Sequence, residues 1–358
     1  MKPFLMIDIG AGTMDVMCYV PSERMHYKAV VRSPVRTLAQ QIESTTGNLV
    51  VTGVEMGGGP VTAALQARAE SAQVLISRSA AATIHHDPAR VAAMGFEITE
   101  DSAVQADVDR GKGTHVELKD LDVKRIRQIV EDFGLNFEFE AVAVCAQDHG
   151  VAPPDVSHLD YRHQLVKTQL DRTPHAHALL YEAQKIPAAF NRLRAIADTA
   201  AQLPAQAVYV MDSGMAAIVG ASMDPSLTGK TTFLVLDVAT SHTVGAVVQQ
   251  DELLGSFEYH THDITRNRLE QLIRDLPEGR LDHAQILSEG GHGAYLRHAP
   301  GFDGIEAIVA TGPKRRIMAH THLPVIWGAP WGDNMMTGCV GLLESMRQSR
   351  GMESITYI

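Results

Sequence analysis

Two apolar runs separated by a small, glycine-bearing turn open the chain. They lie within residues 4–20, and the turn between them holds Gly10, Gly12 and Thr13. This arrangement is typical of a β-hairpin. A third apolar run at residues 27–31 extends the hairpin to a three-stranded meander, so we expect the chain to begin with an antiparallel sheet.

The same strand–turn–strand unit returns about 229 residues later. Residues 232–238 form an apolar strand that contains Asp237, a short turn follows at 239–242, and residues 243–249 run back. A third strand at 253–259 completes a second meander. An internal repeat of this kind predicts two halves built on one plan.

The rest of the chain alternates between helical and strand patterns. Apolar residues at helical spacing predict helices at 35–45, 61–72, 88–94, 124–132, 186–203, 215–221, 265–276 and 334–346. Continuous apolar runs predict buried strands at 48–54, 139–146, 207–211 and 307–311. Residues 97–119 are polar, residues 151–180 are rich in Pro and His, and neither stretch predicts a clear element.

Such alternation predicts an α/β protein of two domains. The N-terminal lobe is expected at residues 1–225, with an insertion at about 73–138, and the C-terminal lobe at 231–333. Residues 224–230 suit the linker between the lobes. The last helix, at 334–348, is expected to pack back on the first lobe.

Composition narrows the class of protein. The chain carries 31 Lys and Arg against 42 Asp and Glu, and its net charge of −11 argues against a nucleic-acid partner. No run approaches the roughly 18 apolar residues of a membrane span, and the apolar run within residues 1–6 is too short for a signal peptide. We therefore expect a cytoplasmic protein with a small-molecule partner and no membrane partner, and a homodimer stays open.

Three widely separated cysteines, Cys18, Cys145 and Cys339, limit the metal chemistry. Without a CxxC pair they cannot build a disulfide framework, a four-cysteine zinc site or an iron–sulfur cluster within one chain. Their spacing indicates a reducing compartment.

The first turn carries residues suited to a phosphate and its metal ion. Gly10 and Gly12 allow a ligand to approach the backbone, whose successive N–H groups form an anion-binding concavity. Asp8 ends the strand before the turn, where a carboxylate is well placed to hold Mg²⁺ through water, and Asp15 begins the return strand. The alternative is a plain hairpin with an Asp-Gly turn.

Five short motifs follow one another along nearly the whole chain, at residues 8–15, 216–220, 237–243, 311–313 and 338–343. Their order resembles that of the actin, heat-shock chaperone and sugar kinase superfamily of ATP-binding proteins. They match, in turn, its first phosphate, first connecting, second phosphate, adenosine and second connecting motifs. The resemblance implies a two-lobed, duplicated ribonuclease H-like fold, the actin-like ATPase fold, with ATP and Mg²⁺ in a cleft between the lobes.

The resemblance also implies which residues hold the nucleotide. They are Asp8, Gly10, Gly12, Thr13, Asp15, Asp237, Thr240, Ser241, Gly312, Pro313 and Lys314, with Asp8 and Asp237 next to Mg²⁺. Ala239 and Thr311 depart from the superfamily pattern, because glycine is usual at both positions. The Cβ of Ala239 would lie near the phosphates, so turnover of ATP stays open.

Asp212, Asp148 and His149 are the candidates for catalysis. Asp212 ends a strand just before the first connecting helix, where ATPases of the superfamily place a water-orienting residue, although an Asp there also suits a helix N-cap. Asp148 is the second candidate. His149 and His292 are next to glycines, which suits acid–base or substrate-binding side chains. Structural hydrogen bonding in a turn is the alternative for both histidines.

Gly57, Gly58 and Gly59 follow a predicted strand and precede Pro60, which suits the first turn of a helix. Their N–H groups would bind a phosphate or a carboxylate of a second substrate, and a merely flexible corner is the alternative. Paired histidines, such as the HxH pair at 260–262, would lie on one face of a strand and could chelate a transition metal. Because no third ligand stands at a recognised spacing, solvated or loop histidines are expected, and metal binding stays open.

Residues 56–60, 147–150, 211–217 and 291–293 are similar to segments of a bacterial and archaeal family labelled "putative pyruvate formate-lyase activating enzyme". A radical activating enzyme of that type holds a 4Fe–4S cluster and S-adenosylmethionine through a CxxxCxxC motif. This chain has no two cysteines close together, so we reject radical chemistry.

The leading hypothesis is a Mg·ATP-binding phosphotransferase or other ATP-dependent enzyme that acts on a small molecule. One alternative is an ATP-driven conformational switch that acts on a protein partner. Another is a degenerate nucleotide-binding protein without catalysis, which the departures at Ala239 and Thr311 suggest.

Overall fold

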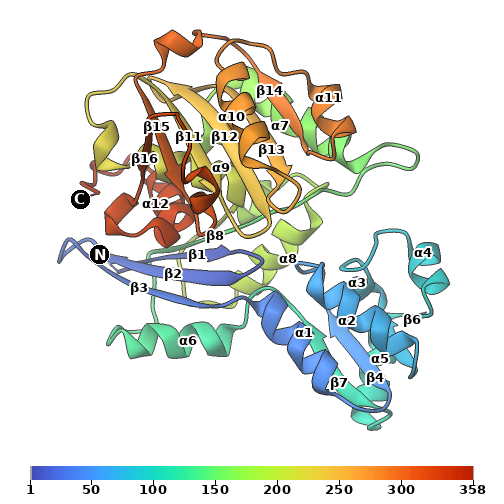
Figure 1. Ribbon diagram of the computed structural model, residues 1–358. Coiled ribbons are helices and arrows are strands. Elements are labelled where there is room, and N and C mark those ends of the chain that lie inside the picture. The colour runs from blue at the N-terminus through green and yellow to red at the C-terminus, as the bar shows by residue number, and fades with distance from the viewer. Residues whose placement is uncertain (1, 358) are drawn as a thin grey trace.

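The computed structural model describes residues 2–357; Met1, with which the predicted N-terminal lobe begins, lies outside them. Figure 1 shows two stacked lobes and a smaller unit beside the lower lobe. Two six-stranded sheets form the lobes, and a four-stranded sheet forms the smaller unit. Among the described residues, none of the helices has the length and apolar character needed to cross a membrane.

The N-terminal lobe is built on the predicted meander. In order across its sheet, the strands are β3 (Met25–Arg32), β2 (Thr13–Val20), β1 (Phe4–Ile9), β8 (Ala141–Ala146), β10 (Val208–Asp212) and β9 (Leu180–Glu182). The first three strands pair antiparallel because short turns connect them. Strands β8 and β10 run parallel to β1, and β9 closes the sheet antiparallel to β10.

The C-terminal lobe repeats this plan. In order across its sheet, the strands are β14 (Gly293–Leu296), β13 (Glu252–His260), β12 (His242–Gln249), β11 (Thr232–Val238), β15 (Ala307–Thr311) and β16 (Val325–Trp327). Strands β11, β12 and β13 form an antiparallel meander, and β15 and β16 run parallel to β11. Three antiparallel strands followed by two parallel ones are the ribonuclease H-like order, so the predicted duplicated, two-lobed fold is confirmed.

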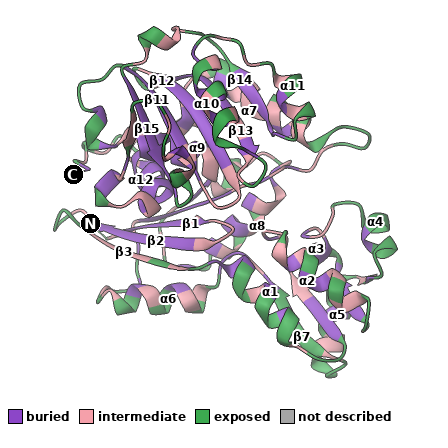
Figure 2. Ribbon diagram, in the orientation of Figure 1, coloured by how far each residue is buried: buried purple, intermediate pink, exposed green. Residues whose placement is uncertain are grey.

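The central strands of both sheets are buried on both faces, which explains why they are apolar along most of their length, whereas the edge strand β3 is half-exposed and carries polar residues. In β1, Phe4 and Met6 enter the core between the lobes, whereas Leu5 and Ile7 enter the core on the outer face. The helices form three layers: α6 (Val123–Asp132) and α8 (Asn191–Ala200) outside the N-terminal sheet, α9 (Ser213–Ser222) and α12 (Thr337–Ser349) between the sheets, and α10 (Arg266–Asp275) outside the C-terminal sheet. In Figure 2, α9 and α12 are buried along most of their length, whereas α6 is exposed on one side.

The central pair of helices meets at two glycines. A Cβ placed on Gly220 of α9 would lie 1.8 Å from the carbonyl oxygen of Thr337, and one on Gly341 of α12 would lie 1.8 Å from that of Ala216. Backbone therefore contacts backbone at the crossing. The small faces that the sequence predicts for these helices are required there by sterics.

The smaller unit is a parallel sheet covered by helices. Its strands, in order, are β6 (Glu97–Thr99), β5 (Val74–Ser77), β4 (Leu49–Gly53) and β7 (Thr114–Leu118). Its helices are α1 (Pro34–Ser44), α2 (Pro60–Ala69), α3 (Arg78–Ala81), α4 (Pro88–Ala93) and α5 (Asp101–Asp109). The unit starts well before the insertion expected at about 73–138, because β4 is one of its two central strands.

Several segments differ from their predictions. Residues 97–119 form β6, α5 and β7, and their apolar signal is weak because few side chains other than Val104, Val116 and Leu118 are buried there. Residues 151–180 contain α7 (His158–Arg172), and α11 (His283–Ser288) was not predicted at all. After Gly312 the chain forms only a 3₁₀ turn, Arg315–Met318.

Replacement of Gly341 tests the helix crossing. We expect Gly341→Ala to lower the free energy of unfolding by about 3 kcal/mol, because the new methyl group overlaps the backbone of α9. Urea unfolding measures the change. Gly304→Ala is the matched control, since its added Cβ has its nearest neighbour, the Cβ of Pro300, at an ordinary 3.6 Å. Equal effects of the two substitutions would contradict the assignment.

Candidate functional site

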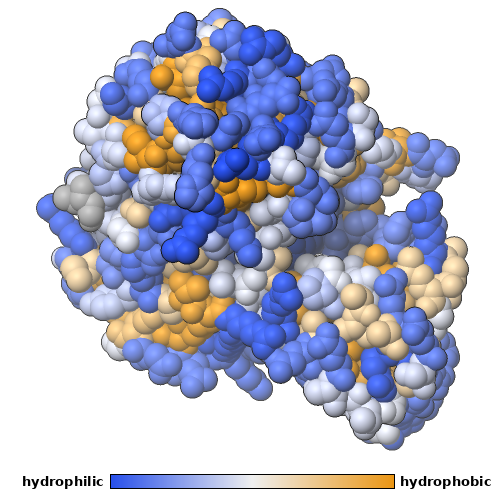
Figure 3. Space-filling view, in the orientation of Figure 1, coloured by the Kyte–Doolittle hydropathy of each residue, from blue (hydrophilic) through white to orange (hydrophobic). Residues whose placement is uncertain are grey.

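A cleft of about 410 Å³ lies where the two lobes and the smaller unit meet. Figure 3 shows the surface hollowed between the upper lobe and the smaller unit. The predicted site residues that line the cleft are Asp8, Gly10, Thr13, Asp15, Gly57, Gly58, Gly59, His149, Asp237, Thr240, Ser241, Gly312 and Pro313. The fold thus brings most of the predicted residues to one place, although they come from five separate parts of the chain.

The two hairpin turns have the same backbone hydrogen bond. The N–H of Gly10 donates to the carbonyl oxygen of Thr13 at 3.0 Å, and the N–H of Ala239 donates to that of His242, also at 3.0 Å. Ala239 therefore adopts the turn that glycine forms in the first lobe. The departure at this position leaves the turn intact.

The turns also touch each other across the cleft. A Cβ placed on Gly12 would lie 2.8 Å from Oγ1 of Thr240, so only glycine fits between the two turns as they stand. Gly12 does not line the cleft itself but closes the gap between the turns. Any ligand held by both turns would contact the two lobes at once.

Three carboxylates lie on the floor of the cleft. Asp8 and Asp15 are directly opposite each other in β1 and β2, and Asp237 is at the equivalent position in β11. Burial, followed by the charge of neighbouring carboxylates, raises the pKa of Asp8 to about 7 and that of Asp15 to about 8. Burial raises the pKa of Asp237 to about 6.

These carboxylates fit a hard divalent cation. Oδ1 of Asp15 is buried and has no hydrogen-bond partner among residues 2–357, which leaves it free to coordinate. A Cβ placed on Gly338 would lie 2.1 Å from Oδ2 of Asp8, so the start of α12 packs directly on that carboxylate. A site of several carboxylate oxygens suits Mg²⁺, and the positive charge would relieve their mutual repulsion.

At position 311, where glycine is usual, the threonine hydroxyl has a structural role. Oγ1 of Thr311 donates a hydrogen bond to Oδ1 of Asp237 at 2.9 Å and so orients this carboxylate. The next residue, Gly312, has a φ of +87°, and a Cβ there would lie 2.5 Å from the carbonyl oxygen of Val238. Lys314 does not line the cleft: its side chain is exposed, and its N–H donates to the same carbonyl oxygen.

Asp212 forms the N-cap of α9, the alternative that its position suggested. Its Oδ1 accepts hydrogen bonds from the N–H groups of Gly214 at 3.0 Å and Met215 at 3.3 Å. Its Oδ2 accepts one from Nη2 of Arg162 at 2.7 Å. Both oxygens are therefore occupied, and a catalytic role has no support in this geometry.

Asp148 is buried behind the wall of the cleft. Its side chain accepts hydrogen bonds from the N–H groups of Gly150 at 2.8 Å and Leu193 at 2.9 Å, which ties β8 to the start of α8. Burial raises its pKa to about 6. The carboxylate positions backbone, and it does not face the cleft as a catalytic group would.

Two other predicted groups are constrained by their surroundings. His149 lines the cleft, but burial and then the charge of Arg162 lower its pKa to about 2, so its imidazole is neutral at physiological pH. The N–H of Gly57 donates to Oδ1 of Asp120 at 3.2 Å and is not free for an anion. Gly58 and Gly59 line the cleft at the start of α2.

Sequence patterns missed two arginines, the buried Arg162 and the half-buried Arg192. Arg162 joins the lobes, because it binds Asp212 of the N-terminal sheet and donates from Nη1 to Oε2 of Glu258 in β13 at 2.8 Å. Arg192 of α8 forms a bidentate ion pair with Asp120, just after β7, at 2.7 and 2.9 Å. Both partners lie far away in the sequence, so no local signal marked either pair.

His292 lies behind the cleft wall. Its Nδ1 is 3.3 Å from Oε1 of Glu258, and its Nε2 is 3.0 Å from Nε2 of His260. Burial would raise the pKa of Glu258, but Arg162 and the neighbouring histidines lower it well below its usual range. The direct substrate contact predicted for His292 is thus not what the geometry shows.

Comparisons with known proteins identify a family and distant likenesses. A family model described as "Putative pyruvate format-lyase activating enzyme (DUF1786)" matches residues 56–317. No curated protein matches the chain.

Solved structures give likenesses over the whole chain. A "putative N-acetylmannosamine kinase" from Listeria monocytogenes is 11% identical over 97% of this chain and 99% of its own, with a TM-score of 0.35. The PilM–PilN type IV pilus biogenesis complex is 12% identical over 98% of both chains, with a TM-score of 0.38. A ROK hexokinase from Thermus thermophilus is 12% identical over 98% of this chain and 90% of its own, with a TM-score of 0.29. The identities and TM-scores of these structures are low, and the fold of this chain is defined by the strand order of its two six-stranded sheets.

The buried carboxylates predict a pH-dependent stability. A carboxyl group whose pKa rises from 3.8 to about 8 on folding binds its proton more tightly in the folded state. Stability contributed by this group is therefore present below about pH 4 and is lost as pH rises through about 8. We expect Asp15→Asn to raise the free energy of unfolding at high pH by at least ~1.4 kcal/mol, the equivalent of one pKa unit.

The measurement is urea unfolding with chelator and without nucleotide, across that pH range. The gain from Asp15→Asn should shrink toward acid pH, where the wild-type carboxyl is protonated in both states. Asp132→Asn, on the exposed side of α6, is the control and should change little at any pH. A gain that grows toward acid pH would contradict the assigned burial of Asp15.

Proposed function

The chain belongs to the family whose model matches residues 56–317, and we propose that it binds Mg·ATP in the interlobe cleft and uses it in a reaction on a small molecule. One observation carries the proposal. Two equivalent hairpin turns face each other across the cleft, above three carboxylates, the buried Asp15 and the half-buried Asp8 and Asp237, and the pKa of each is raised. Buried acids without a cation are costly, and a metal-bound polyphosphate between the turns would explain them.

Each part of the nucleotide has residues that suit it. Mg²⁺ would be held by Asp8 and Asp237, with Asp15 beside them, and would neutralise charge on the phosphates. The turns at 10–13 and 239–242 would surround the phosphates with backbone N–H groups. The adenosine would lie toward Gly312 and Pro313, which line the cleft on the C-terminal lobe.

A small-molecule substrate fits the part of the cleft next to the smaller unit. Gly58 and Gly59 at the start of α2 offer backbone and a helix N-terminus to an anionic group. His149 lies in the same cleft and is neutral, so it would act as a hydrogen-bonding group toward substrate and not as a cationic acid. These features favour an enzyme over a switch, because they surround a pocket and not an open protein-binding face.

The radical chemistry named in the family's description does not fit this chain. Cys18, Cys145 and Cys339 are all buried, and they lie on three different elements, β2, β8 and α12. A 4Fe–4S cluster that activates S-adenosylmethionine needs three cysteines converging on one cluster. The residues of the cleft support phosphate chemistry instead.

Binding of Mg·ATP is tested by thermal unfolding. We expect Mg·ATP at about 100 times its Kd to stabilise the wild type by about 2.7 kcal/mol, and ATP with chelator to stabilise it much less. Asp8→Asn keeps the shape of the side chain beside Gly338 but removes a metal ligand, so it should abolish the Mg²⁺-dependent shift. Asp132→Asn is the control. Full Mg·ATP stabilisation of Asp8→Asn would overturn the phosphate-site assignment.

A second measurement separates enzyme from switch. ADP release is followed while pools of metabolites are added to the wild type with Mg·ATP. Release that depends on one small molecule supports the proposed reaction. Release that responds only to a protein partner would replace the enzyme with the conformational switch, and the binding result above would still stand.

A further inference from the structure

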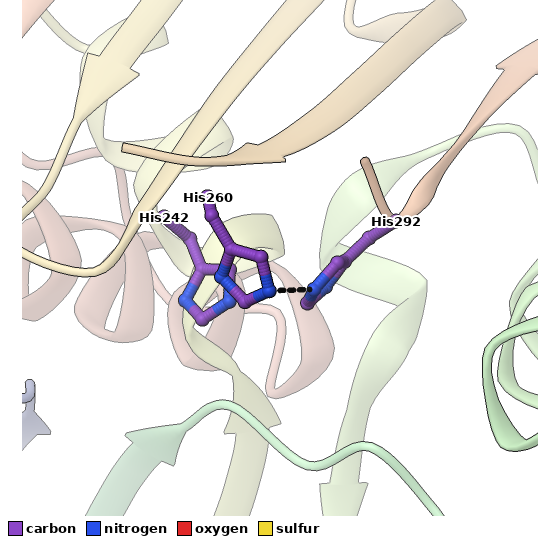
Figure 4. Close-up of side chains that lie close together, drawn as sticks. All are labelled: His242, His260 and His292. Atoms are coloured by element: carbon purple, nitrogen blue, oxygen red, sulfur yellow. Dashed lines mark hydrogen bonds between the residues drawn. The ribbon is translucent and has the colours of Figure 1, made fainter. Parts of the chain in front are cut away.

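Three histidines from separate segments converge on one wall of the cleft (Figure 4). His242 begins β12 and His260 ends β13, and the two are direct partners across the antiparallel pair. His292 precedes β14, and its N–H donates to the carbonyl oxygen of Glu258 at 2.8 Å. One possible ligand nitrogen from each ring lies within 4.8 Å of the others.

The other nitrogens of two rings lie near polar neighbours. Nδ1 of His242 is within hydrogen-bond distance of Oγ of Ser241, at 2.9 Å, whereas Nδ1 of His292 lies 3.3 Å from Oε1 of Glu258 without forming a hydrogen bond. Nε2 of His242 is buried and has no hydrogen-bond partner anywhere in residues 2–357. A carboxylate or hydroxyl on the outer nitrogen is the usual support of a metal-bound imidazole, because it fixes the ring's orientation and raises its basicity.

The distance between two of the ring nitrogens also suits a metal ion. In a tetrahedral site with metal–nitrogen bonds of about 2.05 Å, ligand nitrogens lie about 3.3 Å apart. The separation of 3.0 Å between Nε2 of His260 and Nε2 of His292 is close to this value.

We propose that His242, His260 and His292 bind a divalent transition metal ion of the Zn²⁺ class. Three imidazoles are unsuited to Mg²⁺, which takes oxygen ligands, so this site is distinct from the carboxylates of the first turn. Three protein ligands leave a fourth position, as in catalytic zinc sites. His242 and His260 both line the cleft, so that position would be reached by water or by an oxygen of the substrate.

Glu258 would act as a positioning residue for this metal. It lies behind His292, and Arg162 fixes its other oxygen at 2.8 Å. The same arginine binds Asp212 in the other lobe, so the ligand geometry is connected to the interlobe contact. His149, whose ring centroid is 5.2 Å from that of His292, is a fourth imidazole near the open side.

The site is tested by metal binding to untagged protein. Purified chain is stripped with chelator and then titrated with Zn²⁺ and with Co²⁺, with bound metal measured by mass spectrometry and cobalt geometry by its visible spectrum. We expect one tightly bound equivalent and the intense bands of tetrahedral cobalt. His260→Gln and, separately, His292→Gln should weaken binding at least 100-fold, an estimate that takes the loss of a ligand as no smaller than the loss of its support.

Two variants serve as matched controls. His262→Gln removes the other imidazole of the HxH pair, which is exposed and paired with Asp263, and it should keep full affinity. His177→Gln removes one ring of the stacked pair His175 and His177, which is not part of the proposed site, and this variant should also keep full metal affinity. Melting temperatures in chelator show whether any variant has lost its fold. The cobalt spectrum of the wild type tests the site even if a variant does not fold.

The proposal fails if the stripped wild type binds no tight equivalent, or if His262→Gln weakens binding as much as His260→Gln. In either case the cluster would be held only by the hydrogen bond between His260 and His292 and by that between His242 and Ser241. Asp8→Asn should leave the Zn²⁺ affinity unchanged, so failure of this site and failure of the Mg·ATP site are separate results.

Discussion

Backbone contact between α9 and α12 is the constraint on which the rest of this structure depends. Gly220 and Gly341 let the two helices cross with no side chain between them. The two helices fill the layer between the sheets, where side chains of both sheets share one hydrophobic core with them. Because this layer is thin, the hairpin turns at 10–13 and 239–242, at the strand ends of the two sheets, come together. Larger residues at the crossing would separate the lobes and open the cleft.

The site is a consequence of that approach. Each turn alone is a short hairpin connection, and Gly12 against Thr240 shows how closely the two then meet. Bringing them together also buries Asp8 and Asp15 near Asp237, which raises the pKa of all three. Three carboxylates with raised pKa values in one cleft are electrostatically unfavourable. Groups with strongly shifted pKa values often lie at functional sites, so ligand chemistry is expected here. Arg162 and Glu258 hold the lobes together on the far side of the cleft by a charge pair that is satisfied.

Much of the fold was predictable because its signals are local. The glycine turns, the apolar strands and the small faces of the central helices all appear in short windows, and the repeat makes the two lobes predictable as a pair. The four-stranded unit was less visible, since β6 and β7 are short and half exposed and their parallel partners lie far along the chain. Asp212 and Asp148 were predicted as catalytic residues from their places at strand ends, yet their carboxylates accept hydrogen bonds from N–H groups in the first turns of α9 and α8.

The sequence by itself therefore determined the two meanders and the carboxylates at the turns, because hydrophobic period and turn chemistry act over a few residues. The ribonuclease H-like plan was implied by the resemblance of its five motifs to a known superfamily. Only the tertiary structure decided which polar side chains meet. His242, His260 and His292 share a wall because β12, β13 and the segment before β14 are adjacent in the sheet, and Arg162 reaches Glu258 across the interface between the lobes. Such contacts join residues that are far apart in the chain, and no spacing rule encodes them.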